Sequence, residues 1–319
     1  MKAGLKLCAE ERSAPQLVED AVRAEEAGFD FAAISDHFHP WIDEQGESPF
    51  AWTVLGGIAT ATDRIEVGTG VTCPTIRIHP AIVAQAAATV ATMMPGRSFI
   101  GVGTGENLNE HITGERWPRP DVRRAMLREA VDVMRALWSG EMVTMRGEHY
   151  VVEGARLYSV PDEPPPVLVS ASGSEAVSLA AEIGDGLIGT APDGELISTY
   201  RAEGGDGRVA YGEITVCWDD DPDRALRTVM RCWPNLALPG SLNAELALPK
   251  HFEDTISLVR EDDLRPAVVV GPELDDYLAS VEAYERAGYD GVWFHQVGDD
   301  QEGFTAFAEK ELLPALRAA

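Results

Sequence analysis

The sequence predicts an α/β fold, and specifically a closed (β/α)8 TIM barrel with insertions. Short segments that are apolar at nearly every position, as in strands covered on both faces, alternate with longer segments of helical periodicity. About eight such strand–helix units fit into a chain of this length, which favours a closed barrel. An open, doubly wound sheet is the alternative.

Each expected strand is a short apolar run bounded by a polar turn or a glycine. In chain order, the expected strands are residues 3–8, 29–34, 65–71, 98–102, 167–171, 186–189, 213–218, 267–270 and 291–295. The segments between them carry apolar residues at helical spacing. In chain order, the expected helices are residues 14–27, 50–62, 81–94, 121–138, 175–182, 223–232, 273–287 and 303–317. Gly28 is expected to cap the first helix, and Pro95 with Gly96 to end the third.

Three segments break this alternation and are expected as insertions into a single barrel domain that spans residues 1–319. They lie at about 105–120, 139–165 and 234–264. Within the second insertion, residues 141–156 indicate short strands around a turn, and the proline-rich run 161–166 indicates an extended connector. The third insertion has helical content, and residues 194–212 are assigned neither a helix nor a strand.

The chain is strongly acidic: 26 Lys and Arg residues oppose 53 Asp and Glu residues, which gives a formal net charge of −27. Such a field repels phosphate backbones and anionic membranes, so neither nucleic acid nor a membrane is expected as a partner.

Only four of the basic residues are lysines, which fits a halophilic host or a GC-rich genome equally well. Without a signal-peptide pattern or an apolar run of about 18 residues, a cytoplasmic protein with reduced thiols is expected.

The chain has four cysteines, and their spacing is uninformative for metal binding. They are Cys8, Cys73, Cys217 and Cys232. None belongs to a C-x-x-C pair, so the sequence supports neither a zinc knuckle nor a thioredoxin-type site. No metal site is therefore expected.

In a (β/α)8 barrel the functional side chains lie in the loops after the strands, and this chain has unusual polar residues there. The segment Ser35-Asp-His-Phe-His-Pro-Trp41 follows the second strand. His37 beside Asp36 suits an acid/base role, because a carboxylate can fix the histidine tautomer; a metal ligand or a structural loop residue stays open. Trp41 is either a pocket wall or packing.

Glycine and hydroxyl residues follow three further strands. In Gly101-Val-Gly-Thr-Gly-Glu106 the glycines match a dinucleotide fingerprint only weakly, since the spacing differs and no helix is expected directly after them. They suit the approach of a flat ring to the backbone, with Glu106 facing the ring or solvated in the loop. Gly68-Thr-Gly-Val-Thr-Cys-Pro-Thr75 suits close cofactor approach or a bulge, with Cys73 as a small pocket residue. Ser170-Ala-Ser-Gly-Ser174 precedes a helix and suits a phosphate.

The segments Ser35–Trp41, Gly68–Val71 and Gly103–Glu106, in this order and spacing, resemble the luciferase-like superfamily. Within it, the chain is similar to the coenzyme F420-dependent dehydrogenases, nearest to the branch of the F420-dependent glucose-6-phosphate and secondary alcohol dehydrogenases. The resemblance covers nearly the whole chain. It implies a (β/α)8 barrel, a homodimer, and coenzyme F420 as hydride acceptor at the barrel mouth.

The resemblance also implies roles for individual residues. His37 stands where the family places the base for the substrate hydroxyl, Glu106 where a carboxylate faces the pyrimidine side of the deazaflavin, and Trp41 where the reacting carbon is covered. The bond between Gly70 and Val71 matches the family's cis peptide. The further expected cofactor contacts are Asp36, Gly70, Val71, Cys73, Thr104, Gly105, Asn109, Ser172 and Gly173. The expected substrate contacts are Glu10, Trp41, Lys250 and His251.

The residues that would hold a sugar phosphate depart from the family pattern. The family's glucose-6-phosphate enzymes use two lysines and one arginine. Lys250 matches one of them, whereas Asp193 and Ala267 stand at the other two positions, with Arg265 close to the latter. A carboxylate beside a phosphate turns attraction into repulsion. We therefore expect a dehydrogenase that transfers a hydride from the carbinol carbon of a neutral alcohol or another sugar derivative to C5 of the deazaflavin.

Three alternatives to this function stay open. A reductase of an alkene, imine or folate-like substrate would use the hydride of reduced F420 in the opposite direction. A luciferase-like monooxygenase would hold FMN in place of F420. A non-catalytic barrel that binds a cofactor or a partner would need neither His37 nor Glu106.

Overall fold

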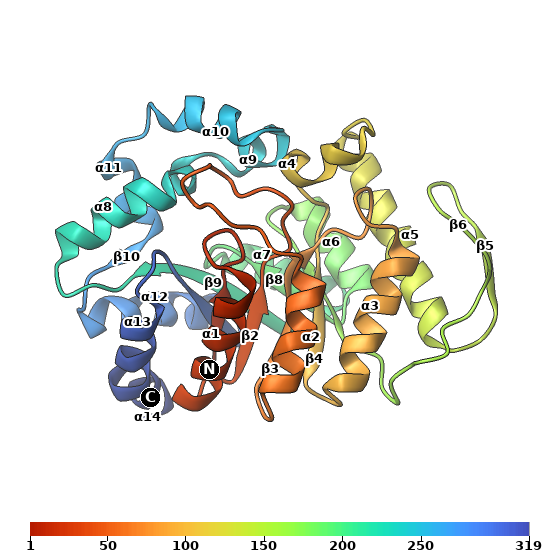
Figure 1. Cartoon of the computed structure of the whole chain (residues 1–319), viewed down its shortest axis with the longest axis horizontal. Helices are drawn as coiled ribbons and strands as arrows, with labels where there is room; N and C mark the ends of the chain where they lie inside the picture. The colour runs from red at the N-terminus through yellow and green to blue at the C-terminus, as the bar shows by residue number, and fades with distance from the viewer. Residues whose placement is uncertain (319) are drawn as a thin grey trace.

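The computed structural model of the chain describes residues 1–318. Eight of the nine strands of its main sheet form a parallel ring, which the β8–β9 and β11–β1 pairings close. Figure 1 shows this barrel from the side. This ring confirms the predicted (β/α)8 barrel over the doubly wound sheet. In order round the ring, the strands are β1 (Lys2–Leu7), β2 (Phe31–Ile34), β3 (Glu66–Thr72), β4 (Ser98–Val102), β7 (Val167–Ser170), β8 (Gly186–Gly189), β9 (Val209–Cys217) and β11 (Gly291–Gln296).

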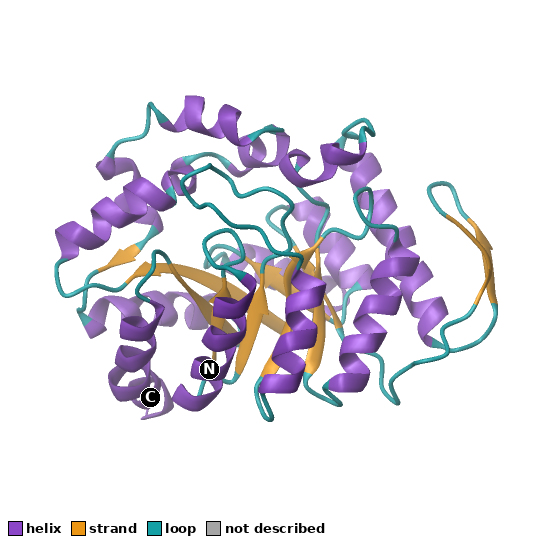
Figure 2. Cartoon of the chain, viewed as in Figure 1, coloured by secondary structure: helices purple, strands orange, loops and turns teal. Residues whose placement is uncertain are grey.

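Helices connect the strands and surround the barrel, as Figure 2 shows. The first, α1 (Ala14–Ala27), ends where predicted, because Gly28 takes the left-handed conformation (φ 91°) that favours glycine at a C-cap. Among the residues described, no helix has the length and apolarity of a membrane span. The other helices on the outside are α2 (Ala51–Ala61), α3 (Pro80–Met93), α5 (Pro120–Trp138), α6 (Ser174–Ile183), α8 (Pro222–Cys232), α12 (Leu274–Ala287), α13 (Gln301–Phe307) and α14 (Leu313–Ala318).

Aromatic side chains fill the inside of the barrel. Phe31 stacks on Tyr211 with ring centroids 4.5 Å apart, and it meets Trp293 edge-on at 6.1 Å. A Cβ at Gly4 would lie 2.6 Å from the Phe31 ring, so glycine is needed there to make room for the aromatic layer. Because these rings fill the barrel, the polar residues nearer the carboxyl ends of the strands are left to line a cavity.

The expected insertions form separate structures around the barrel. In the third, α9 (Gly240–Glu245), α10 (Pro249–Ile256) and α11 (Glu261–Leu264) run across the carboxyl ends of the strands, at the top of Figure 1. In the second, β5 (Val143–Arg146) and β6 (Val151–Ala155) pair as an antiparallel hairpin that projects from the side of the barrel. In the first, a short helix, α4 (Asn107–Glu110), begins directly after Glu106, where no helix is expected from the sequence.

Two further segments differ from the sequence-based expectation. Residues 194–212, to which no helix or strand is assigned from the sequence, hold a helix, α7 (Gly194–Tyr200), and the start of β9. The Asp193 carboxylate accepts hydrogen bonds from two N–H groups of the first turn of α7, an N-cap signal that the following glycine obscures in the sequence. Residues 267–270 contribute only β10 (Val269–Val270), which pairs with the end of β9 outside the ring.

Candidate active site

The carboxyl ends of the barrel strands open into a cavity of about 940 Å³. This volume lies at the upper end of the range for cofactor and small-molecule sites. The Gly70–Val71 peptide bond in its wall is cis, as predicted. Six of the predicted site residues line the cavity: Glu10, His37, Trp41, Gly70, Val71 and Glu106.

The imidazole of His37 is held in a single orientation in this wall. Its Nδ1 lies 3.2 Å from the carbonyl oxygen of His39, and because a carbonyl only accepts, Nδ1 carries a hydrogen. Its Nε2 lies 3.4 Å from Oε1 of Glu10. In the neutral ring Nε2 is therefore the basic nitrogen, and Glu10 stands ready to stabilise the imidazolium that forms when Nε2 takes a proton.

Glu10 is a buried carboxylate that stays ionised. Its residue exposure is 1%, and burial alone would raise its pKa. The positive charges of His37 and Lys6 and a hydrogen bond instead lower the pKa of Glu10 to about 2. That hydrogen bond comes from the Ser35 hydroxyl, which donates to Oε2 at 2.5 Å. Glu10 is thus a fixed negative charge beside Nε2 of His37 at neutral pH.

Trp41 forms a rigid part of the same wall. Its indole lies 5.0 Å from the ring of His37 and meets Phe252 edge-on at 5.2 Å. Phe252 belongs to α10 and is fully buried, so the third insertion fixes the position of the indole. The backbone N–H of Trp41 also donates to the side chain of Gln45 at 2.8 Å.

Asn109 connects the Glu106 loop to the His37 loop. Its Oδ1 accepts from the backbone N–H groups of Phe38 at 2.9 Å and His39 at 3.3 Å. Its Nδ2 donates to Oε2 of Glu106 at 3.3 Å. Asn109 is 2% exposed, so it orients the carboxylate of Glu106 from behind the cavity wall.

Asp36 also acts from behind the wall. Its carboxylate accepts from the hydroxyl of Thr72 at 2.7 Å and from Nη2 of Arg77 at 2.9 Å. Arg77 in turn approaches the buried Glu110, whose pKa burial raises to about 7. Seven predicted cofactor contacts are not among the described residues that line the cavity, and their role stays a prediction. They are Asp36, Cys73, Thr104, Gly105, Asn109, Ser172 and Gly173.

The predicted phosphate-binding positions are not brought together. Within the part of the chain that the structure describes, the cavity wall includes neither Lys250 nor His251, which are exposed on α10. Lys250 pairs through Nζ with Asp254 at 2.7 Å. Asp193 caps α7 and is exposed, whereas Arg265 does line the cavity.

The cavity wall holds a partly buried ion pair that was not predicted from the sequence. Lys6 on β1 places its Nζ 2.8 Å from Oε2 of Glu213 on β9, and Trp293 donates its indole N–H to the same oxygen at 2.7 Å. Burial favours a neutral amine, but the charges of Glu213 and Glu10 raise the pKa of Lys6 above its usual value. A lysine inside an otherwise apolar strand is the signal in the sequence that marks this pair.

A sequence model of the family described as luciferase-like monooxygenase matches residues 2–274 of the chain. The chain belongs to this family. Within the luciferase-like family it stands with the F420-dependent dehydrogenases, as its motifs predict. Relatives named F420-dependent glucose-6-phosphate dehydrogenase include that of Segniliparus rotundus, 39% identical over 100% of this chain and 98% of the relative. That of Mycobacterium tuberculosis is 37% identical over 99% of this chain and 98% of the relative.

One solved structure agrees with this assignment, and a second shares the fold. An F420-dependent secondary alcohol dehydrogenase in complex with an F420-acetone adduct superposes with a TM-score of 0.92 at 30% identity, covering 99% of this chain and 98% of that one. The F420-dependent tetrahydromethanopterin reductase of Methanopyrus kandleri superposes with a TM-score of 0.78 at 22% identity over 98% of this chain and 99% of that one, a likeness of fold alone.

Proposed function

We propose that this F420-dependent oxidoreductase oxidises an uncharged alcohol or sugar derivative, with His37 as the base that takes the hydroxyl proton. The observation that carries the proposal is the pairing of His37 Nε2 with Glu10 at 3.4 Å in the cavity wall. Removing a hydride from a carbinol carbon requires the loss of the hydroxyl proton, so a base must stand within hydrogen-bond reach of that hydroxyl. His37 meets this requirement with its tautomer set by the His39 carbonyl.

The residues of the cavity fit a deazaflavin. Gly70, Val71 and Ile188 offer small apolar surface to the face of a planar ring, and Glu106 offers a carboxylate to its edge. Oε2 of Glu106 accepts from Asn109, which leaves Oε1 to hold or give a proton at the ring. When bound, the deazaflavin supplies the hydride acceptor, and the protein supplies binding, orientation and electrostatics.

The remaining steps belong to the protein's own residues. The substrate hydroxyl donates to Nε2 of His37, which takes the proton as the carbinol carbon gives up its hydride. Glu10 stabilises the imidazolium, because its carboxylate is ionised at every pH above its pKa of about 2. Trp41 packs beside His37 and keeps water away from the reacting carbon.

The charges of the cavity wall support an uncharged substrate. Four carboxylates line it (Glu10, Glu106, Glu213 and Asp276) against two permanent cations, Lys6 and Arg265. Glu213 neutralises Lys6 at 2.8 Å, so Arg265 is the one remaining cation among the described wall residues that could meet a phosphate. The secondary alcohol dehydrogenase with its F420-acetone adduct supports a small neutral substrate, whereas the names of the curated relatives favour glucose 6-phosphate.

A spectroscopic assay tests the proposal. The protein is mixed with oxidised F420 in high KCl, 2-propanol or glucose 6-phosphate is added, and the loss of deazaflavin absorbance is followed. We expect bleaching with the alcohol. Bleaching with the sugar phosphate alone would keep the cofactor and the base but refute the substrate class. F420 binding without bleaching by either would favour the reductase.

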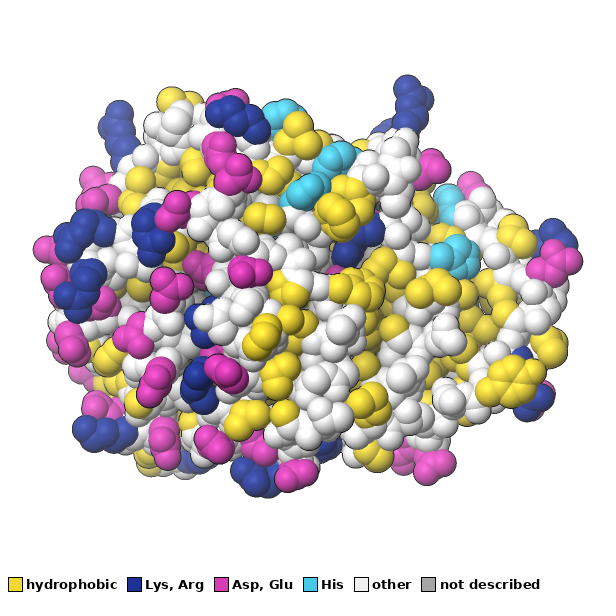
Figure 3. All heavy atoms as spheres, viewed as in Figure 1, with side chains coloured by type: hydrophobic (Ala, Val, Ile, Leu, Met, Phe, Trp, Pro, Cys, Tyr) yellow, Lys and Arg dark blue, Asp and Glu magenta, His cyan; other side chains and the backbone are white. Residues whose placement is uncertain are grey.

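We also propose that the chain forms a homodimer. Apolar side chains gather on the face shown in Figure 3, around the positions of α2 and α3. Ile82 and Met93 on α3 are 56% and 40% exposed, and Phe50 beside α2 is 48% exposed. Exposed apolar patches mark interaction surfaces, and a second copy of the chain is the partner that the family resemblance implies. Sedimentation equilibrium would give twice the chain mass; a monomer at micromolar concentration would refute the dimer.

A further inference from the structure

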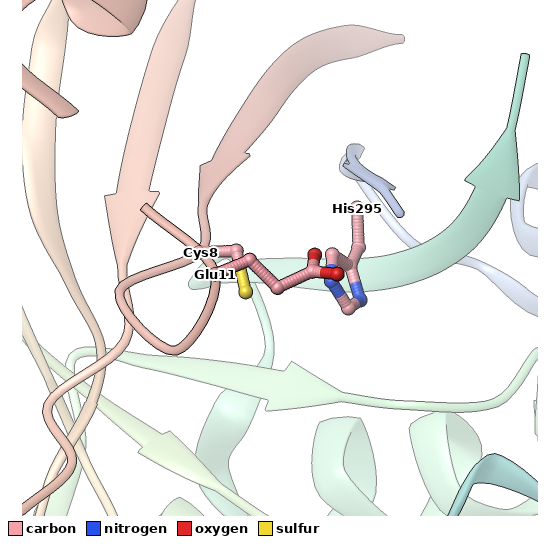
Figure 4. A group of neighbouring side chains, drawn as sticks. All are labelled: Cys8, Glu11 and His295. Atoms are coloured by element: carbon pink, nitrogen blue, oxygen red, sulfur yellow. The ribbon is translucent and has the colours of Figure 1, made fainter. Parts of the chain in front are cut away.

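Next to the His37–Glu10 pair, three side chains with metal-binding atoms converge at the end of the barrel. They are Cys8, Glu11 and His295; in Figure 4 the Glu11 carboxylate reaches the ring of His295, and the Cys8 sulfur lies beside the Glu11 side chain. The thiol sulfur, a carboxylate oxygen and a ring nitrogen all lie within 4.8 Å of one another. These are the three ligand types that zinc sites combine in proteins.

The fold builds this cluster from two adjacent strands. Cys8 and Glu11 stand at either end of the tight turn that follows β1, where the Glu11 N–H donates to the Cys8 carbonyl at 3.4 Å. Their three-residue separation equals that of the two ligands in a C-x-x-C metal knuckle. β11 pairs with β1 in parallel and brings His295 beside the turn. The sequence did not suggest a metal because the second member of the knuckle is a glutamate.

The histidine of the cluster is buried and lacks a partner. His295 is 1% exposed, and its Nε2 makes no hydrogen bond to any of residues 1–318. A buried polar atom of this kind is destabilising unless something satisfies it. Trp233 packs edge-on against the ring, with centroids 4.5 Å apart, which fixes its orientation. Burial lowers the pKa of His295 to about 4, so the imidazole is neutral, as a metal ligand must be.

The surroundings of the cluster are rich in sulfur. Cys8 belongs to an apolar cluster that also contains Cys217 and Cys232, so three of the four cysteines gather here from distant parts of the chain. The carboxyl group of Glu11 accepts a hydrogen bond from the backbone N–H of Gly298 at 3.4 Å. Burial raises the pKa of that carboxyl group to about 7, so a cation beside it would favour its ionised form.

We propose that Cys8, Glu11 and His295 form a binding site for a thiophilic divalent cation, with Zn²⁺ as the best match. Binding forms one bond each to sulfur, oxygen and nitrogen, and the Cys8 thiol releases its proton to solvent; no redox change occurs. One thiolate, one carboxylate and a neutral imidazole balance the two charges of the ion. The ionised Glu10 lies beside the site, because the Cys8 thiol donates to Oε2 of Glu10 at 3.3 Å.

The expected role of the ion is structural. It would tie both ends of the turn that carries Glu10, at Cys8 and Glu11, to His295 on β11. The Glu10 carboxylate would thereby be held against His37. Cys8, Glu11 and His295 are positioning residues in this arrangement, since none of them lines the cavity within the described chain.

The test uses the full chain, first treated with a chelator and then titrated with Zn²⁺ in competition with a chromophoric chelator. We expect one Zn²⁺ per chain. Titration with Co²⁺ is expected to produce a thiolate-to-metal charge-transfer band, which reports on ligation by Cys8. Neither readout uses turnover or F420, so failure here is distinguishable from failure of the proposed function.

Variants locate the site. Cys8→Ala and His295→Gln are each expected to weaken Zn²⁺ binding by more than the roughly 10–100-fold that changes outside the ligand set produce, and Cys8→Ala is expected to abolish the band. The matched control is Cys73→Ala, which removes a buried thiol elsewhere in the barrel and is expected to keep both. If the first two variants do not fold, Glu11→Gln replaces them, since it keeps the side-chain size and removes the anionic ligand.

Two results would overturn the proposal. One is wild-type protein that, correctly folded by circular dichroism, binds Zn²⁺ no more tightly than Cys8→Ala or Glu11→Gln. The other is a Co²⁺ charge-transfer band that survives in Cys8→Ala.

Discussion

Replacing Glu10 by Gln tests the assignment of His37 most directly. The change removes a negative charge 3.4 Å from Nε2 of His37 and keeps the shape of the side chain. Two unit charges at this separation attract by about 5 kcal/mol at an effective dielectric constant of about 20. This is an upper limit, because the His37 side chain is 10% exposed and water screens part of the attraction. Since about 1.4 kcal/mol corresponds to a tenfold change in rate, we expect kcat to fall by roughly 100- to 1000-fold.

The assay is the bleaching of oxidised F420 under single-turnover and steady-state conditions, with the substrate that the initial screen identifies. The affinity for F420, measured by its fluorescence, is expected to stay at the wild-type value. Glu47→Gln is the matched control: it removes an equal charge from an exposed side chain of the same region and is expected to leave kcat unchanged. A Glu10→Gln enzyme that keeps more than a tenth of the wild-type kcat would show that Glu10 does not stabilise the imidazolium of His37.

Three further changes test other parts of the site. His37→Ala should abolish turnover while F420 still binds by fluorescence titration; measurable bleaching in this variant would remove His37 from the role of base. Asp193→Lys should give no activity on glucose 6-phosphate and should lower the free energy of unfolding by about 1 kcal/mol, because the side chain caps α7; a gain of sugar-phosphate activity would contradict the structural role. Burial raises the pKa of Glu110 from its ordinary value of 4.5 to about 7, so the folded state holds this proton more tightly. The contribution of Glu110 to stability therefore falls as pH rises through that window, by about 3 kcal/mol in total. Glu110→Gln should remove this decline in urea unfolding at pH 4.5 and 8, and parallel curves for the two proteins would be inconsistent with a raised pKa.

The barrel could be predicted because its strands are buried on both faces and its helices carry one apolar stripe. Those patterns are local in the sequence and do not depend on how distant segments of the chain pack. The segment 194–212 could not be placed, because α7 is short and its cap, Asp193, is followed by a glycine that reads as a turn. The strand expected at 267–270 is apolar like the others, but only its last two residues pair, and they pair outside the ring.

The candidate site was predictable where a motif carries it and not where packing decides. His37, Trp41 and Glu106 lie in contiguous segments that follow barrel strands, and all three line the cavity. Lys250 is predicted as a substrate contact because its position matches a lysine of the family. Its side chain instead pairs with Asp254 on the exposed face of α10. Whether a residue of an insertion faces the cavity depends on how its helix docks, which no local pattern encodes.

The ion pair of Lys6 and Glu213 also affects the charge balance around His37 in the cavity wall. Glu10 is a buried carboxylate and Glu213 a partly buried one, and two such groups in one wall would ordinarily raise each other's pKa. Lys6 interacts with both, and the pKa of each carboxyl group is lowered despite burial. The formal charges then sum to zero over Glu10, Glu213, Lys6 and His37 only when the imidazole of His37 carries its second proton. When His37 takes the proton of a neutral hydroxyl, the charges of these four groups therefore balance in a poorly solvated wall. An anionic substrate would add a negative charge and cancel that balance.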